Sequence, residues 1–320
     1  MSLLTALSIP CAILPALGFL WLMWWLDRYD REPWWLFGSA FLWGSLPAAG
    51  LVYLATRLPF PTVPGIDAGA LLLIEGALLA PLLEEPAKAA ILPFIARSRH
   101  FDNTTDGFVY GAAAGIGFAM SENLLYFVAA ARSGESATWL GLVTTRTLYC
   151  ALMHASASSV VGAALGWAKA KAPAARLQAL VLGLCGALVI HGVWNGLLVA
   201  GTVFSGGFSL LDLLIFPVEF VVLFGIFQAC LLDEARILRE GLAEEARAGV
   251  LPEEYAVRLS SWAQRNRKGW LPPEIDHRRL VQVATTLAFR KERAGGRVAD
   301  PELDLEIEGL RDELRRILKT

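Results

Sequence analysis

The sequence predicts an all-α, polytopic membrane protein with about seven transmembrane helices and a helical cytoplasmic C-terminal tail. Of its 320 residues, 55% are hydrophobic and only 18% are charged, and the mean hydropathy is +0.50. These values are far more apolar than those of an ordinary soluble domain. The charges are also unevenly distributed, because residues 1–232 hold 11 Lys/Arg and 13 Asp/Glu whereas residues 233–320 hold 17 of each. We therefore expect a transmembrane domain at 1–232 and a charged, helical cytoplasmic tail at 233–320.

Apolar stretches that reach the roughly 20 residues of a bilayer-spanning helix recur along the first part of the chain. They cover residues 3–26, 34–56, 69–96, 105–131, 138–168, 177–201 and 208–232. The first stretch lacks a positively charged start and is too long for the apolar region of a cleavable signal peptide, so we expect it to be a span. Pro81, Pro86 and Pro93 predict a kinked third span, because proline removes a backbone donor and collides with the preceding turn.

The connections between these stretches predict the orientation. Lys and Arg gather in the first, third and fifth connections, at Arg28, Arg31, Arg97, Arg99, Lys169, Lys171 and Arg176. Because cytoplasmic loops are enriched in these residues, we expect an integral protein of the cell membrane with its N-terminus outside and its tail in the cytoplasm. In the tail, Pro252 and the Asp300–Pro301 pair are typical of helix starts.

Other features exclude several classes of protein. The net charge of -2 gives no indication of nucleic-acid binding. The cysteines lie inside apolar runs without paired spacing, so the sequence predicts neither a disulfide framework nor a CxxC metal site.

Polar side chains inside the predicted spans are the main indication of function. An ionisable group in the membrane costs about 2.5–3.5 kcal/mol on insertion scales and usually faces a cavity or a partner. With a rise of about 1.5 Å per residue, such groups from the third, fourth, fifth and sixth stretches fall at similar, central depths. They are Glu84, with Glu85 and Lys88 beside it, then Glu122, then His154, and finally His191, with the amide of Asn195 one turn further along the same helix. We expect these side chains to meet in one polar site.

Helical spacing orients some of these groups. Glu84 and Lys88 are four residues apart and share a helix face, whereas Glu85 is rotated by about 100° from Glu84. Only one of the two glutamates can therefore point straight into a common site. Burial raises the pKa of a carboxylate, and a nearby lysine lowers it. A carboxylate under both influences is suited to act as the base that activates water. Arg146 lies two turns from His154 near a span end, and we expect it to have a packing or interface role.

The order of these motifs resembles that of a known family. The motifs are Glu84-Glu85-Pro86-Ala87-Lys88 (EExxK), Phe118-Ala119-Met120-Ser121-Glu122 (FxxxE) and His191-Gly192-Val193-Trp194-Asn195 (HxxxN). Over about residues 1–232 the chain resembles the PrsW family of intramembrane proteases, within the superfamily of CAAX-prenyl and bacteriocin-processing (CPBP) membrane proteases.

The resemblance implies an intramembrane endopeptidase that hydrolyses a peptide bond in or near the membrane of a membrane-anchored protein. It implies regulated proteolysis, for example of an anti-sigma-factor-like regulator. Glu84 would be the base, assisted by the residue at the position of Glu122. The CAAX branch usually has a histidine at that position, and His154 of the next span is our candidate to supply the missing imidazole. His191 and Asn195 would donate hydrogen bonds to the developing oxyanion. The implied catalytic residues are thus Glu84, Glu85, Glu122, His154, His191 and Asn195, with Lys88 behind them as an orienting group.

Glutamate-activated water requires no cofactor, and zinc is the alternative. Its ligands would then be Glu122, His154 and His191, although the sequence has no HExxH motif. A non-catalytic membrane scaffold and a proton-coupled transporter are the other classes that these residues allow, because buried glutamate, histidine and lysine also build proton relays. The expected partners are a membrane-anchored protein or peptide substrate and the lipid bilayer, without nucleic acid.

Overall fold

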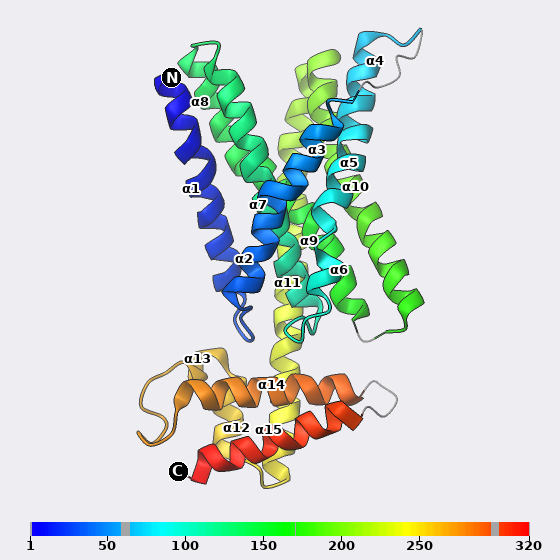
Figure 1. The fold of residues 1–320 in the computed structure, drawn as a ribbon. Helices are drawn as coiled ribbons and strands as arrows, with labels where there is room; N and C mark the ends of the chain where they lie inside the picture. The colour runs from blue at the N-terminus through cyan, green and yellow to red at the C-terminus, as the bar shows by residue number, and fades with distance from the viewer. Residues whose placement is uncertain (1, 59–64, 170, 296–300, 320) are drawn as a thin grey trace. The chain divides into compact units, whose positions relative to one another are not determined.

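The computed structural model describes residues 2–58, 65–169, 171–295 and 301–319, and within these ranges every regular element is helical, as predicted (Figure 1). The chain forms two compact units. The first consists of Met1–Leu26 and Glu32–Phe227, and the second of Asp27–Arg31 and Gln228–Thr320. The predicted end of the membrane domain, at residue 232, falls inside one long helix, α11 (Gly206–Arg247), to which both units contribute residues.

The first unit is a bundle of long helices, several of which contain a π-helical turn, labelled η. Its elements are α1 (Leu3–Leu26), α2 (Trp34–Trp43), η1 (Gly44–Ala48), α3 (Ala49–Ala55), α4 (Ala68–Leu73), η2 (Ile74–Leu79), α5 (Ala80–Ala89), α6 (Leu92–Ile95), α7 (Thr104–Ala131), α8 (Ser136–Thr145), η3 (Arg146–Cys150), α9 (Ala151–Ala168), α10 (Pro173–Val203) and the first part of α11. Helix α7 packs against α1, α2 and α9, so it forms the centre of the unit.

Six helical segments of the described residues are long and apolar enough to cross a membrane. They are Leu3–Leu26, Trp34–Ala55, Thr104–Ala131, Ser136–Ala168, Pro173–Val203 and Gly206–Arg247. The chain is therefore a multi-pass membrane protein. The predicted stretch 69–96 is not among the six, so this criterion does not reproduce the predicted count of seven. This stretch carries several charged residues, and its helix is interrupted by a turn at Ala90–Ile91. The interruption lies two residues before Pro93, which cannot donate to the hydrogen-bond ladder of the preceding helix.

Small residues bring α7 and α9 into close contact. A Cβ atom on Gly107 would lie 2.0 Å from the carbonyl oxygen of Gly162, and one on Gly115 would lie 2.2 Å from that of His154. Such spacing of small residues lets helix backbones approach closely. The approach fixes His154 beside α7, about two turns before Glu122.

A side chain of α2 forms a hydrogen bond with the C-terminal end of α5. The indole of Trp43 donates a hydrogen bond of 2.9 Å to the carbonyl oxygen of Ala87. Ser121 of α7 likewise donates to the carbonyl oxygen of Ser45. The paired glutamates of α5 and Glu122 of α7 are thus anchored to the same neighbouring helix, α2–η1.

The second unit has its own apolar core. It combines the end of α11 with α12 (Glu253–Ser260), α13 (Trp262–Arg265), α14 (His277–Gly295) and α15 (Pro301–Lys319). Its completely buried leucines are Leu238, Leu242, Leu280, Leu287 and Leu314. Asp300, which we predicted to begin the last helix, lies outside the described residues.

The short segment Asp27–Arg31 belongs to this second unit. Arg265 donates hydrogen bonds to the carbonyl oxygens of Arg28, at 3.3 Å, and Tyr29, at 2.5 Å. Burial lowers the pKa of the Arg265 guanidinium. A loop far away in the sequence thereby satisfies donors of a buried arginine.

Candidate active site

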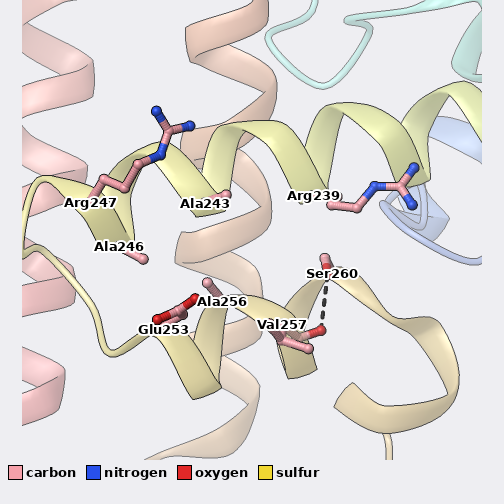
Figure 2. A pocket seen from close by; sticks show the side chains of 8 residues that line it. All are labelled: Arg239, Ala243, Ala246, Arg247, Glu253, Ala256, Val257 and Ser260. Carbon is pink, nitrogen blue, oxygen red and sulfur yellow. Dashed lines mark hydrogen bonds between the residues drawn. The ribbon is translucent and has the colours of Figure 1, made fainter.

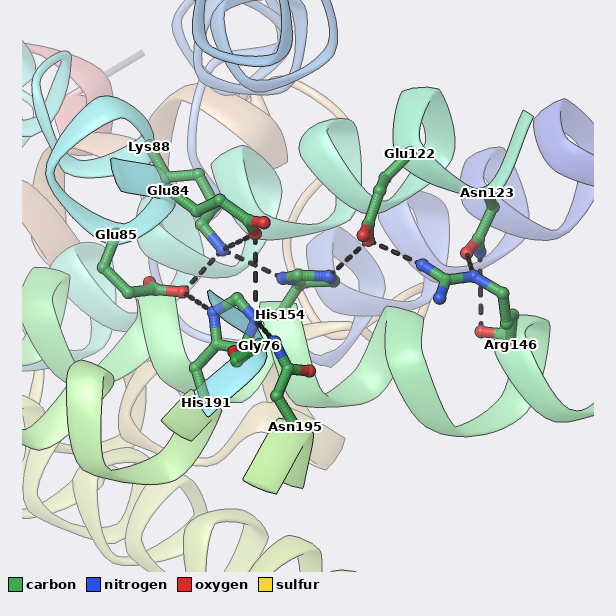
Figure 3. A network of polar contacts seen from close by, with 10 residues as sticks. All are labelled: Gly76, Glu84, Glu85, Lys88, Glu122, Asn123, Arg146, His154, His191 and Asn195. Carbon is green, nitrogen blue, oxygen red and sulfur yellow. Dashed lines mark hydrogen bonds and ion pairs between the residues drawn. The ribbon is translucent and has the colours of Figure 1, made fainter. Parts of the chain in front are cut away.

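The Lys88 side chain lies at the centre of the predicted polar site (Figure 3). It is completely buried on α5. Its ammonium nitrogen lies 2.5 Å from Oε1 of Glu85, 3.6 Å from Oε2 of Glu84 and 2.9 Å from Nδ1 of His154. The helical spacing of three and four residues explains the first two contacts. The third joins α5 to α9.

His154 is held on both sides of its ring. Nδ1 faces Lys88, and Nε2 lies 2.9 Å from Oε2 of Glu122 on α7. An ammonium group can only donate and a carboxylate can only accept. Nδ1 is therefore the acceptor, and Nε2–H donates to Glu122. These contacts select one tautomer of a neutral imidazole.

His191 on α10 is fixed in a similar way. Its Nδ1 lies 2.7 Å from Oε1 of Glu85, and its Nε2 lies 3.1 Å from Nδ2 of Asn195 and 3.8 Å from Oε2 of Glu84. The Asn195 amide also donates to the carbonyl oxygen of Gly76 at 3.0 Å, which sets its orientation. Nε2 of His191 is thus an acceptor. The oxyanion-donor role implied by the resemblance would require a proton on this atom.

Arg146, in the π turn η3, is the polar residue whose role the sequence analysis missed. Its guanidinium lies 2.7 Å from Oε2 of Glu122, donates to Oδ1 of Asn123 at 2.9 Å and stacks 3.7 Å from the Tyr126 ring centre. It therefore does more than pack, because it binds the carboxylate that holds His154. The sequence did carry a signal for this role, because Arg146 is a basic residue two turns from His154. Glu122 is the only acidic residue of the fourth apolar stretch after its first turn, and it lies within reach of Arg146.

A cavity of about 200 Å³ borders this network. Its walls come from η2, α5, α7, η3, α9 and α10, and the lining includes Gly76, Glu84, Glu122, Tyr126, Arg146, His154, Asn195 and Val199. Glu84 faces the cavity, whereas Glu85 does not line it and pairs with Lys88 and His191. Just one of the two adjacent glutamates thus points into the common site.

The cavity lies to one side of Glu84 and His154 along the helices of the first unit. From Glu84 and His154, the lining continues to Gly76, Tyr126 and Val199. Gly76 precedes Glu84 in the chain, whereas Tyr126 and Val199 lie near the ends of α7 and α10. Helices α7 and α10 end on the side of the bundle where α1 and α4 begin (Figure 1).

Some of these donors could also hold a metal ion. Ligand atoms of Glu84, His154 and His191 lie within 4.8 Å of one another. One carboxylate and two imidazoles form a donor set of catalytic zinc sites, and Oε2 of Glu84 is buried without a hydrogen-bond partner. The donor chemistry therefore fits zinc. Glu84 takes the place that we expected for Glu122, whose carboxylate lies on the other side of His154 with Arg146.

A second hollow, of about 340 Å³, lies in the second unit between the end of α11 and α12 (Figure 2). Its lining combines small side chains with charged groups, namely Arg239, Ala243, Ala246, Arg247, Glu253, Ala256, Val257 and Ser260. The predicted site residues all belong to the first unit. The candidate active site therefore belongs to the first unit.

A multi-pass helical bundle with carboxylates, histidines and an amide around an internal cavity has the composition of an intramembrane hydrolase. Comparison with known proteins agrees with this class. Residues 32–226 match the profile of the family described as "PrsW family intramembrane metalloprotease". The chain belongs to the PrsW family and is an intramembrane protease.

Named relatives support the assignment. The chain is 30% identical over 193 residues to "Protease PrsW" of Bacillus subtilis, covering 60% of this chain and 83% of the relative. It is 28% identical over 215 residues to that of Oceanobacillus iheyensis, covering 67% and 89%. It is 31% identical over 193 residues to that of Geobacillus kaustophilus, covering 60% and 80%. No solved structure matches the chain significantly.

Proposed function

We propose that Glu84 activates the water that hydrolyses a peptide bond in this protease. The observation that carries the proposal is the division of labour between the paired glutamates. Each glutamate has a buried Oε2 without a hydrogen-bond donor, but only Glu84 lines the cavity, whereas Glu85 lies behind it with Oε1 paired to Lys88 and His191. A general base needs a free lone pair facing its reactant. Glu84 meets this requirement.

In the proposed reaction, Glu84 takes a proton from water while the hydroxyl oxygen bonds to the carbonyl carbon of the substrate. Arg146 lines the same cavity, and we assign to its guanidinium the hydrogen bond that stabilises the oxyanion. The amide of Asn195 donates both of its protons, to Gly76 and to His191. Collapse of this intermediate breaks the carbon–nitrogen bond, and the proton held by Glu84 passes to the leaving nitrogen. Glu85, Glu122 and Lys88 keep the histidines in fixed orientations.

Zinc is the second candidate for part of this chemistry, because the donor set fits and the family description names a metalloprotease. Glu84, His154 and His191 would hold the ion. When bound, zinc acts as a Lewis acid and lowers the pKa of its water. Our proposal remains that the chain supplies the base and the oxyanion donor itself and requires no cofactor.

We propose membrane-anchored proteins, for example an anti-sigma-factor-like regulator, as substrates. With the N-terminus outside and the tail in the cytoplasm, as the Lys/Arg distribution favours, the cavity lies on the outer side of Glu84. A scissile bond near the outer end of a substrate span would then reach Glu84. The paired glutamates, histidine and asparagine also support membership of the CPBP superfamily.

The test uses purified full-length protein in liposomes with a library of single-span reporters. Cleavage products are identified by mass spectrometry for the wild type, Glu84→Gln and the matched control Glu75→Gln, whose side chain is exposed. We expect a new terminus close to the outer end of the reporter span with the wild type and the control alone. Cleavage at the same bond by Glu84→Gln would contradict the role of Glu84. Activity lost in a strong chelator and restored by zinc would select the metal-dependent form.

A further inference from the structure

The Lys88 ammonium lies among the same donors that could hold a metal ion. It contacts Oε2 of Glu84 at 3.6 Å and Nδ1 of His154 at 2.9 Å. Its third partner, Glu85, binds Nδ1 of His191. A positively charged group of the chain thus already lies next to members of the metal-ligand set.

We infer that Lys88 is the resident cation of this site and that its ammonium and a divalent metal ion exclude one another there. The inference rests on the proposed placement of the reaction at Glu84. It adds that the side chain of Lys88 decides whether the cluster can be a metal site.

The first argument is the availability of lone pairs on His154. A histidine ligates metal through an unprotonated ring nitrogen. Nδ1 accepts from Lys88, and Nε2 carries the proton that is donated to Glu122. Both ring nitrogens are therefore engaged, and ligation requires the ammonium to leave Nδ1.

The second argument is charge. Lys88 and Glu85 are completely buried, and Glu84 is nearly so. In such surroundings like charges repel much more strongly than in water. The ammonium compensates two adjacent carboxylates, and a divalent ion bound to Glu84 and His154 would lie next to it. Binding a metal while Lys88 stays in place would thus cost free energy that the carboxylates must offset.

Metal affinity of the purified protein tests the inference without relying on activity. Zinc dissociation constants are measured by competition with a chromophoric chelator for the wild type, Lys88→Met and Lys88→Gln. Lys171→Met is the matched control, because Lys171 is exposed and its ammonium lies over the Trp167 ring. Adding His154→Gln to Lys88→Met tests whether the new affinity belongs to this cluster.

We expect Lys88→Met or Lys88→Gln to bind zinc at least about tenfold more tightly than the wild type, within the range by which groups around a metal site change affinity. The control should match the wild type, and His154→Gln should remove the gain. Equal or weaker binding by a folded Lys88 variant overturns the inference. If neither variant folds, the wild type decides. Retention of one zinc per chain after dialysis against EDTA contradicts the inference, and loss of zinc supports it.

Cleavage by the same preparations separates this inference from the proposed function. Loss of reporter cleavage in Glu84→Gln tests the role of Glu84 as the base, and this result does not depend on the zinc affinities. A wild type that cleaves its reporter but holds zinc tightly would overturn the role of Lys88 and leave that of Glu84 intact.

Discussion

The carboxylate of Glu122 lies 2.9 Å from Nε2 of His154, on the opposite side of the imidazole from Lys88. Since Arg146 binds the same carboxylate oxygen, the site is a chain of alternating charges with a neutral ring at its centre. The chain links Glu85, behind the cavity, to Arg146, at the cavity wall. Changes at Glu122 should therefore act on catalysis through the orientation of His154.

Replacing Glu122 with glutamine tests this link. The amide keeps the size of the side chain but removes the charge that pairs with Arg146. We expect the rate of reporter cleavage to fall by about 10–100-fold, as for other groups that orient catalytic residues. Single-turnover rates would be compared with those of Glu135→Gln, whose side chain is exposed. Equal rates for the two variants would show that the contact with His154 is not needed.

Arg146 offers a pair of matched substitutions. Arg146→Lys keeps a positive charge near Glu122 but loses the planar fork that also reaches Asn123. Arg146→Met removes the charge and leaves the half-buried carboxylate of Glu122 without its cation. We expect Arg146→Met to lose about 10²–10³-fold in kcat, as when one oxyanion donor is removed, and Arg146→Lys to lose less. Rates that match the wild type in both would restrict Arg146 to packing.

The contact between α7 and α9 predicts a loss of stability. A Cβ on Gly162 would lie 1.8 Å from the carbonyl oxygen of Gly107, so Gly162→Ala must separate the two helices. We expect a destabilisation of about 1–3 kcal/mol, measured as a lower thermal unfolding temperature in detergent. Gly141→Ala is the control, because a Cβ there meets no atom within 4 Å. Equal unfolding temperatures would contradict the close approach.

In the second unit, Glu245 is completely buried and accepts hydrogen bonds from Arg311 and Lys291. The hydrogen bond to Glu245 raises the pKa of the Arg311 guanidinium, so this side chain stays charged. Glu245→Ala would leave two cations without their shared acceptor. We expect a loss of about 1–3 kcal/mol, seen as faster proteolysis of the tail in the full-length protein. The exposed neighbour Glu244 also pairs with Lys291, and Glu244→Ala should have a much smaller effect. Equal effects would contradict a structural role for burial at Glu245.

Much of the fold could be predicted because apolar stretches of spanning length are visible in the sequence. The third apolar stretch, 69–96, is the one predicted span that is not among the six candidate membrane-crossing segments of the described residues. Its charged residues and Pro93 lower its hydropathy and interrupt its helix, and both effects follow from the residues that build the site. The assignment of Asp27–Arg31 to the second unit could not be predicted, because it depends on hydrogen bonds from Arg265 across more than 200 residues.

The candidate site could be predicted in membership but not in its pairings. Depth and helical spacing brought the polar residues of the third to sixth stretches together. The contact between Lys88 and His154 depends on how closely α5, α7 and α9 approach, which glycine contacts such as Gly115 with His154 determine. The role of Arg146 depends on the π turn η3, which changes the helix face on which it lies.

The most direct test of the account is the single-turnover rate of reporter cleavage by Glu84→Gln, measured beside the wild type and Glu75→Gln. Removal of a general base typically lowers a rate by about 10²–10⁴-fold. The account predicts a loss of this size for Glu84→Gln with unchanged thermal unfolding, and wild-type rates for Glu75→Gln. A folded Glu84→Gln protein that cleaves at the wild-type rate would contradict it.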